Sequence, residues 1–276
     1  MAVERSTGRV MLVTGASSGF GQAIAEALQA RGHRVFGTTR SPSPAAAPGG
    51  LPLVTMNVDD CASVDAGVAE ILRRAGQIDV LVNNAGLGYA GAIEDTTVGE
   101  ARAQFETNFF GLHRVCRAIL PHMRERRAGR IVNMSSLGGL VSVPFQAMYC
   151  ASKFAVEAYT EALRMEARPF GIHVSMIEPG DFATRFTANR RLTAESTAGS
   201  PYAERCRSAV HRMAEDETRN ADIGPVVRAA LAAIESDRPR LRYPAAGALQ
   251  RTLAALRPVL PQSLFEYLVM GHYGIR

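Results

Sequence analysis

Short runs of apolar residues alternate along this chain with longer segments in which apolar residues recur at the spacing of a helix. The runs lack the polar alternation of a half-exposed strand, so they predict strands buried on both faces, as in a parallel sheet covered by helices. We expect strands at Arg9–Thr14, His33–Thr39, Leu51–Met56, Ile78–Asn83, Arg130–Ser135 and Ile172–Glu178, helices near Gly19–Arg31, Cys61–Ala75, Val98–Arg127 and Met148–Arg168, and a Pro/Ala/Gly-rich loop at Ser41–Gly50. The repeated order of strand, helix and strand predicts an α/β fold with a doubly wound parallel sheet and right-handed crossovers.

The regularity ends in the last third of the chain. Residues 181–222 are polar, and we expect a helix near Ile223–Ser236 and a short strand near Arg240–Tyr243 to follow them. The remaining tail is apolar and interrupted by proline; it could close over a substrate, extend a subunit interface or touch a membrane surface. We predict a single domain over residues 1–276, with a variable substrate-loop region at 181–222 and a C-terminal extension at 244–276.

The net charge of +5 and the pI of about 9.3 raise the question of nucleic-acid binding. Acidic residues are interspersed among the arginines, however, no basic run is interleaved with aromatic residues, and Trp is absent. We therefore expect no nucleic-acid partner.

The four cysteines have no zinc-like or C-x-x-C spacing, so they predict reduced thiols and no metal site. The first residues lack the apolar core of a signal peptide. No uninterrupted apolar run approaches the ~18 residues that a membrane span requires. We expect a cytoplasmic protein without stable membrane insertion.

A glycine-rich turn, TGASSGFG at Thr14–Gly21, lies where the first predicted strand gives way to a helix. Glycines there permit a tight turn and a close approach of the backbone to a pyrophosphate, and the helix N-terminus offers free N–H groups. The spacing is G-x-x-x-G-x-G and differs from the usual G-x-G-x-x-G fingerprint, so a packing turn is the alternative for the motif alone. Its position after a strand and before a strand–helix–strand continuation favours nucleotide binding.

The end of the second predicted strand bears on the choice of cofactor. An NAD site usually has an acidic residue here for the ribose 2′-hydroxyl, whereas an arginine suits the 2′-phosphate of NADP. No acidic residue lies between His33 and Ser43, and Arg40 is present. We predict that NADP(H) is preferred and that NAD(H) remains usable. A solvated loop charge is the alternative for Arg40.

All but one of the 31 basic residues are arginine, and the exception is Lys153. Lys153 stands four residues after Tyr149 in a predicted helix, so the two side chains share one face. A free tyrosine titrates near ~10, and a neighbouring ammonium favours the phenolate, which lowers the pKa towards the range of proton transfer at neutral pH. An ordinary pair on a helix surface is the alternative for any isolated Y-x-x-x-K.

Several motifs occur together and in order: TGASSGFG at Thr14–Gly21, NNAG at Asn83–Gly86, TNFFG around Asn108, NMSS at Asn133–Ser136, YCASK at Tyr149–Lys153 and PGDFAT at Pro179–Thr184. Over about residues 8–185 the chain therefore resembles the short-chain dehydrogenase/reductase family. The resemblance implies a Rossmann-type parallel sheet of about seven strands, flanked by helices on both faces, and a nicotinamide cofactor.

The resemblance also implies a catalytic set. Tyr149 matches the acid/base that exchanges the hydroxyl proton, and Lys153 matches the residue that lowers the pKa of the tyrosine and holds the nicotinamide ribose. Of two adjacent serines, Ser136 rather than Ser135 stands at the usual distance from the tyrosine to orient the carbonyl. Asn108 matches the asparagine that holds a water against the lysine, with a helix-bending core amide as the alternative.

The cofactor set follows in the same way. It comprises Gly15, Ser17, Ser18, Gly19, Phe20, Gly21, Arg40, Asn57, Val58, Asn84, Ala85, Gly86, Tyr149, Lys153, Pro179, Gly180 and Thr184. Thr184 matches the residue that bonds the nicotinamide carboxamide. Asn57 departs from the aspartate usual in relatives, which we expect to be a minor change, and Asp59 could serve as a helix N-cap.

We thus predict an NADP(H)-dependent oxidoreductase that interconverts a carbonyl and a primary or secondary alcohol. A non-enzymatic NADP-sensing protein and an NAD-dependent alcohol dehydrogenase are the alternatives. We expect a homodimer or homotetramer and a small-molecule substrate.

The substrate is predicted to be lipophilic. Its pocket is expected to be lined from Leu87–Tyr89, Leu137–Phe145, Gln146, Glu178 and residues 181–222, where Phe145, Phe182, Phe186 and Met213 form either an apolar pocket or ordinary core. His113, Arg185 and His211 are either polar specificity groups or solvated side chains.

Overall fold

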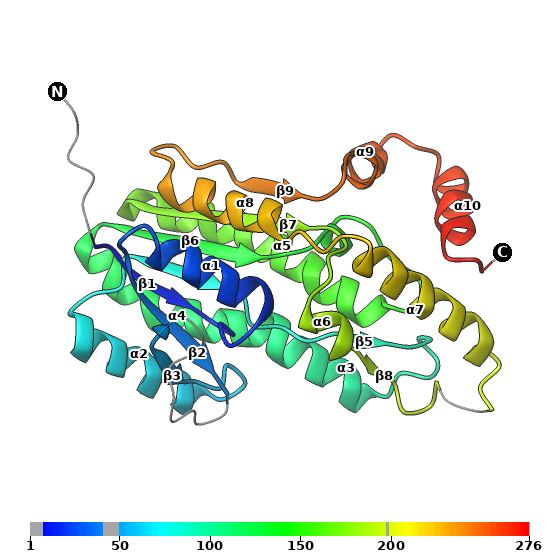
Figure 1. Ribbon diagram of the computed structural model, residues 1–276, viewed down its shortest axis with the longest axis horizontal. Coiled ribbons are helices and arrows are strands. Elements are labelled where there is room, and N and C mark those ends of the chain that lie inside the picture. Colours follow the sequence, from blue (N-terminus) through cyan, green and yellow to red (C-terminus); the bar gives the residue numbers. More distant parts are fainter. Residues whose placement is uncertain (1–7, 41–49, 197–198, 276) are drawn as a thin grey trace.

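The computed structural model describes residues 8–40, 50–196 and 199–275, so the predicted loop at Ser41–Gly50 lies almost wholly outside the described residues. Within the described residues seven parallel strands form one sheet in the order β3-β2-β1-β4-β6-β7-β9 (Figure 1). The strands are β1 (Val10–Val13), β2 (Arg34–Thr39), β3 (Leu53–Thr55), β4 (Val80–Asn83), β6 (Gly129–Met134), β7 (Ile172–Pro179) and β9 (Arg242–Ala245). The predicted α/β fold with a Rossmann-type sheet is confirmed.

The strand order reverses beside β1, which pairs with β2 on one side and with β4 on the other. Leu12 lies opposite Phe36 and Leu81 in this register. Every residue of β1 and β4 is buried, which is why both are apolar except for Asn83 at the end of β4. The carboxyl ends of these two strands form the switch point at which open α/β sheets bind ligands.

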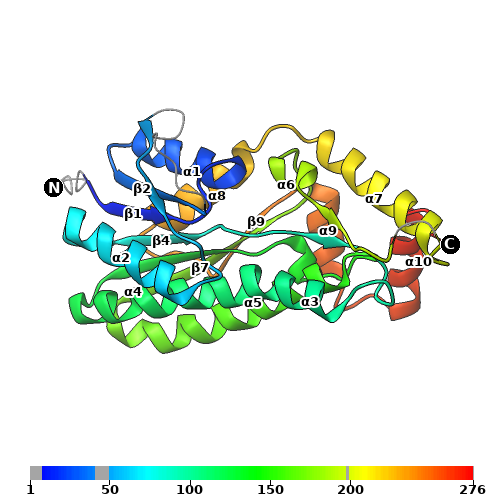
Figure 2. The same cartoon turned by 90° about the horizontal axis from the view of Figure 1, so that it is seen from below.

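Two apolar layers cover the two faces of the sheet (Figure 2). Helices α1 (Gly19–Gln29) and α8 (Gly224–Glu235) pack on one face through residues such as Ile24, Leu28 and Ile234. Helices α2 (Cys61–Ala75), α4 (Leu112–Arg126) and α5 (Ala147–Ala167) cover the other. Asp60 caps α2 by accepting a hydrogen bond from Ala62 N, so the suggestion that Asp59 is the cap was wrong.

The long helix expected at Val98–Arg127 is not one regular α-helix. It comprises α3 (Val98–Phe105), a π-helical segment at Glu106–Gly111, and α4. A Cβ at Gly111 would lie 2.8 Å from Val58 Cγ2, so the glycine allows the widened turn to approach its neighbour closely. The interruption falls on Asn108, one of the predicted site residues, as π-bulges often do at functional sites.

The region expected to be irregular contains ordered elements. In residues 181–222 these are α6 (Arg185–Ala188), β8 (Arg191–Leu192), which pairs with β5 (Tyr89–Ala90), and α7 (Ala203–Thr218). The buried stripe of α7 is Ala203, Cys206, Ala209, Met213 and Glu217. Because most of these residues are small or polar, the helical spacing of the buried positions is hard to recognise in the sequence.

The tail also folds. Strand β9 begins two residues later than expected and forms the sheet edge beside β7, where its Pro244 is tolerated. Two helices follow, α9 (Ala248–Leu256) and α10 (Gln262–His272). Figure 2 shows α10 beside α7, and a hydrogen bond of 2.8 Å joins His272 to Asp216. No helix among the described residues is long and apolar enough to cross a membrane.

Candidate active site

A cavity of about 1160 Å³ opens at the carboxyl ends of β1, β4, β6 and β7. Its wall includes most of the predicted cofactor residues together with Ser136, Tyr149, Lys153 and Asn108. Gly21 and Asn57 are the predicted residues that do not line it. The motifs, which are far apart in sequence, therefore meet in one place.

The glycine-rich turn is held so tightly that side chains are excluded. Gly15 and Gly19 have positive φ values of +63° and +59°, which favour glycine. A Cβ at Gly21 would lie 2.4 Å from Asn84 Nδ2 and 2.6 Å from the carbonyl oxygen of Gly15. Gly21 is thus required for packing behind the turn, although it does not face the cavity.

The first turn of α1 lies at the cavity wall, and its backbone N–H groups are free donors there. Ser18 is the N-cap, but its side chain makes no capping hydrogen bond. An uncapped helix N-terminus beside a glycine turn is a suitable site for a phosphate group. The donor set therefore fits the pyrophosphate of a dinucleotide.

The NNAG motif locks this turn to β4. Asn84 Nδ2 donates to the carbonyl oxygens of Thr14 and Gly15 at 2.9 and 3.1 Å, and Thr14 Oγ1 accepts from the N–H groups of Asn84 and Ala85. Asn83 instead donates to Asn133 Oδ1 at 2.9 Å on the neighbouring strand. The first asparagine joins strands of the sheet, whereas the second shapes the cavity wall.

Arg40 lies at the end of β2, is exposed, and lines the cavity. It forms no salt bridge within the described part of the chain, so its guanidinium is available to an anion. Val58 lines the cavity as expected. The side chain of Asn57 instead accepts a hydrogen bond from Asp59 N at 3.3 Å, in the turn that precedes α2.

The two candidate serines face different surroundings. Ser135 is buried and donates a hydrogen bond to Glu157 within the core. Ser136 follows β6 at the cavity wall, accepts a hydrogen bond from Gly138 N at 3.0 Å, and hydrogen-bonds with Tyr149. The geometry supports the choice of Ser136, because Ser135 is engaged elsewhere.

Tyr149 and Lys153 lie one turn apart on α5. The Lys153 Nζ atom is 5.9 Å from the centre of the Tyr149 ring and donates to the carbonyl oxygen of Met134 at 2.8 Å. The ring of Phe186 covers Tyr149 at 5.6 Å between centroids. The ammonium therefore lies over the ring, and its hydrogen bond goes to the Met134 carbonyl instead of the phenol oxygen.

The pKa of Tyr149 is raised above its usual value, and the sequence-based expectation of a lowered pKa was wrong for this state of the protein. Burial is the main cause, and it outweighs the hydrogen bond with Ser136, which acts in the opposite direction. Burial also lowers the pKa of Lys153 to about 8, partly opposed by Glu157. At neutral pH Tyr149 is thus a protonated phenol, and Lys153 is mostly protonated until the pH rises through about 8.

Asn108 is buried and its amide is fully engaged. It accepts from Leu87 N at 2.9 Å, and it donates to Leu87 O at 3.1 Å and to Ser152 Oγ at 3.2 Å. These bonds tie the π-helical segment to the loop after β4. The role of Asn108 in holding a water against Lys153 stays a prediction.

The substrate side of the cavity is only partly as expected. Leu87, Gly88, Leu137, Gln146, Arg185, Phe182, Phe186 and Met213 line it. Further residues of the predicted ranges, among them Val141, Ser142 and Val143, also line it. Four named candidates do not: Phe145 and Glu178 are not part of the wall, His113 contacts Tyr159, and His211 pairs with Glu215 on the surface. Glu178 instead forms an ion pair with Arg242, in which Arg242 Nε lies 3.0 Å from Glu178 Oε1.

The tail supplies a wall that the sequence-based site did not include. Leu249, Gln250 and Leu253 of α9, Phe265, Leu268, Val269 and His272 of α10, and Tyr273 all line the cavity. The tail thus forms part of the cavity wall, and its roles at a subunit interface or a membrane surface stay predictions. The spacing of Phe265, Leu268, Val269 and His272 is helical and could have identified α10 as amphipathic.

Residues 9–195 match the short chain dehydrogenase family. The chain belongs to the short-chain dehydrogenase/reductase family and is an oxidoreductase of that class. The 3-ketodihydrosphingosine reductase of Bacteroides thetaiotaomicron is 39% identical over 269 residues, which cover 97% of this chain and 99% of that protein.

Two solved structures of the same fold contain different nicotinamide cofactors, one NAD and the other NADP. A short chain dehydrogenase/reductase from Burkholderia phymatum in complex with NAD is similar with a TM-score of 0.79 and 27% identity, covering 93% of this chain and 95% of that one. A short chain dehydrogenase from Burkholderia cenocepacia in complex with NADP has a TM-score of 0.74 and 27% identity, with coverage of 95% and 98%. The fold alone therefore does not choose between NAD and NADP.

Proposed function

We propose that this protein is an NADP(H)-dependent reductase that converts a ketone on a long-chain lipophilic substrate to a secondary alcohol. One observation carries the proposal. Ser136 and Tyr149 lie in a single cavity, between a backbone-built wall suited to a dinucleotide and a largely apolar wall closed by α9 and α10.

The glycine turn, the N-terminus of α1 and Asn84 would hold the pyrophosphate, and Thr184 and Lys153 would hold the nicotinamide end. Arg40 supports NADP(H), because an exposed guanidinium without an acidic partner suits a 2′-phosphate. When bound, the cofactor supplies the hydride that reaches the carbonyl carbon.

Ser136 and Tyr149 act on the carbonyl oxygen. Both hydroxyls donate hydrogen bonds to it, and these bonds strengthen as negative charge develops on the oxygen. The phenolic proton of Tyr149 then passes to the oxygen, which completes the alcohol. At neutral pH Tyr149 is a protonated phenol and can therefore supply this proton.

The substrate class rests on the apolar wall and on the Bacteroides relative. Phe186 of α6, Met213 of α7, leucines of α9 and apolar side chains of α10 line this cavity of about 1160 Å³, and such surfaces suit an alkyl chain. The relative is named for the reduction of 3-ketodihydrosphingosine, a ketone on a long saturated chain. We infer a substrate of that kind here.

The test is a panel of short- and long-chain ketones and aldehydes, with oxidation of NADPH or NADH followed by absorbance. The wild type should reduce long-chain ketones with NADPH. Tyr149→Phe should lower kcat by about 10²–10⁴-fold, the usual contribution of a general acid, while NADPH affinity changes by less than about threefold.

A phenylalanine variant that retains most of the wild-type kcat would contradict the role of Tyr149. Tight NADPH binding without turnover of any carbonyl would favour the non-enzymatic, NADP-sensing alternative. A higher kcat/KM with NADH would reject the cofactor assignment.

A further inference from the structure

The cavity has one acidic corner, which the proposed reduction does not use. Asp181, which follows β7, and Asp216 and Glu217 of α7 all line the cavity. Much of the surrounding wall is apolar, including Phe182 and Met213. Carboxylates in such surroundings are unfavourable unless cations compensate them, so their partners indicate what the corner can bind.

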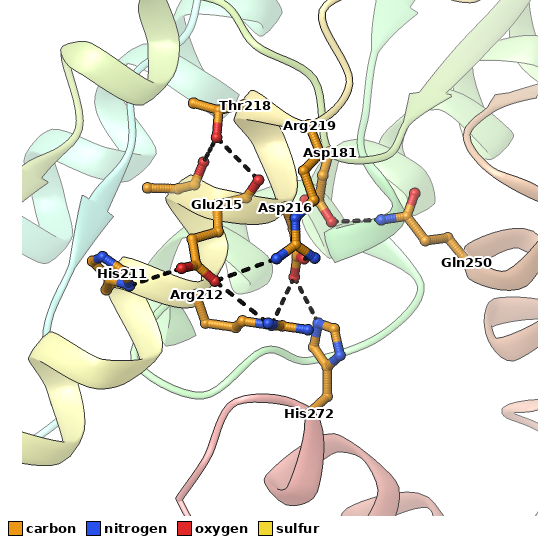
Figure 3. A network of polar contacts seen from close by, with 10 residues as sticks. Asp181, His211, Arg212, Glu215, Asp216, Thr218, Arg219, Gln250 and His272 are labelled. Carbon is orange, nitrogen blue, oxygen red and sulfur yellow. Dashed lines mark hydrogen bonds and ion pairs between the residues drawn. The ribbon is translucent and has the colours of Figure 1, made fainter.

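Asp216 is compensated by the protein itself. Its carboxylate lies 2.8 Å from His272 Nε2, 3.6 Å from Arg212 Nε and 3.5 Å from an Arg219 nitrogen (Figure 3). These contacts join α7 to α10. They leave Asp216 with a structural role at the rim of the cavity.

Asp181 is different, although it lies next to this network (Figure 3). Its carboxylate accepts a hydrogen bond from the neutral amide of Gln250, and no cation within the described ranges forms an ion pair with it. Its pKa is raised to about 6, first by burial and then by the charges of Glu217 and Asp216. Gln250 and the charge of His272 act in the opposite direction, so Asp181 is a carboxylate with no ion-pair partner among the described residues, at a ligand-sized cavity.

Glu217 adds an unpaired acceptor oxygen at the same corner. The residue is 8% exposed, and one carboxylate oxygen pairs with Arg190. The other oxygen, Oε2, is buried and has no hydrogen-bond partner among the described residues, and neither has Arg190 Nε. The charges of Glu217 and Arg190 both act on the pKa of Tyr149, so this pair lies near the reacting end of the cavity.

We propose that Asp181 and Glu217 form a subsite for a cationic amino group that stands beside the carbonyl of the substrate. This inference rests on the proposed function and narrows its substrate class to long-chain amino ketones. An ammonium is compact and has three donors, which suit the free oxygen of Glu217 and the uncompensated carboxylate of Asp181.

The chemistry of the corner favours an ammonium over a metal ion. Within the described residues no group of three or more His, Cys, Asp and Glu side chains is arranged to hold a metal. 3-Ketodihydrosphingosine, after which the Bacteroides relative is named, carries an amino group on the carbon beside its ketone. It is therefore a suitable probe for the subsite.

The experiment compares kcat/KM for 3-ketodihydrosphingosine with kcat/KM for its N-acetyl derivative, which has the same chain but no positive charge. The wild type should prefer the free amine by about tenfold to hundredfold, the usual range for a charge-assisted hydrogen bond. Asp181→Asn keeps the shape and the Gln250 contact and should reduce this ratio below about threefold. Glu217→Gln should reduce it too, with thermal unfolding measured because the Arg190 pair is weakened.

Glu215→Gln is the matched control, because Glu215 lies on the same helix and in the same network but does not line the cavity. The ratio of kcat/KM for the free amine to kcat/KM for the N-acetyl derivative should be the same in Glu215→Gln as in the wild type. Equal use of both substrates by the wild type, or an unchanged ratio in Asp181→Asn, would overturn the subsite and leave ketone reduction standing. Failure of the wild type to reduce any ketone would instead reject the proposed function, and the subsite with it.

Discussion

The two walls of the cavity are built in different ways. The cofactor-side wall consists mainly of backbone: the turn after β1, the end of β4 and the first turn of α1, locked by the bonds between Thr14 and Asn84. The substrate-side wall consists largely of side chains from α6, α7, α9 and α10. These four helices lie outside the strand–helix repeats of the first 180 residues, which add Leu87, Leu137 and Gln146.

The difference has a physical cause. A pyrophosphate is bound by N–H groups and a helix end, which need glycines at fixed positions and tolerate few other residues. An alkyl chain needs only apolar surface, which many residue combinations provide. Small substitutions at a few positions of the cofactor-side wall should therefore weaken cofactor binding strongly. Most substitutions in the substrate-side wall should weaken substrate binding only slightly.

The largest effect is expected for Gly21→Ala. The new Cβ would overlap Asn84 Nδ2 and the carbonyl oxygen of Gly15, so the turn must shift. We expect a loss of about 1–3 kcal/mol in stability and a loss of about hundredfold in NADPH affinity. Thermal unfolding and fluorescence titration with NADPH measure the two effects.

Gly99→Ala is the control for this change. Gly99 is an exposed glycine of α3, and the nearest atom to an added Cβ is 3.8 Å away. This variant should bind NADPH normally and gain up to about 1 kcal/mol in stability from helix propensity. Normal cofactor affinity in Gly21→Ala would contradict the view that packing behind the turn fixes the site.

A smaller effect is expected for Arg40→Asp, which changes a side chain and leaves the backbone wall intact. Loss of a charge-assisted contact should raise the KM for NADPH by about tenfold to thirtyfold, whereas the KM for NADH should change by less than about threefold. Steady-state kinetics with both cofactors measure the difference. The control is Arg207→Asp, which makes the same charge change at an exposed position outside the cavity wall and should alter neither KM. Equal effects of Arg40→Asp on the KM values of both cofactors would show that Arg40 does not recognise the 2′-phosphate.

The smallest effect is expected on the substrate-side wall. Leu253→Ser removes apolar surface from α9, and we expect the KM for a long-chain ketone to rise by about fivefold because one buried side chain contributes about 1–3 kcal/mol. The KM for NADPH should stay the same. Leu256→Ser, on the same helix but 41% exposed and away from the cavity, should change neither KM; a change in NADPH binding by Leu253→Ser would show that the two walls are coupled.

How far the sequence predicted this site depends on the kind of residue. Tyr149, Lys153, Ser136 and most of the glycine turn could be identified because a fixed spacing carries their chemistry. Asp181 lies in the PGDFAT motif, but its neighbours in the sequence do not show that it has no ion-pair partner. That property depends on Gln250, which is distant in sequence and reaches Asp181 only after α9 has folded.

The protonation state of Tyr149 is a second example. From its spacing to Lys153 we expected a lowered pKa, but the folded protein raises it, because burial depends on Phe186 and on the whole cavity wall. Helical spacing places two side chains on one face; it does not determine how far each is removed from water.

By itself, the sequence determined the order of strands and helices, the turn that suits a dinucleotide and the placing of Tyr149 and Lys153 on one face of α5, because these depend on local spacing and on continuous apolar runs. Only the tertiary structure decided that the tail closes the cavity, that Ser135 faces Glu157 while Ser136 faces Tyr149, and that an uncompensated carboxylate stands at the substrate end. Those features arise from contacts between residues far apart in the chain, where burial and the balance of charge are set jointly by several elements.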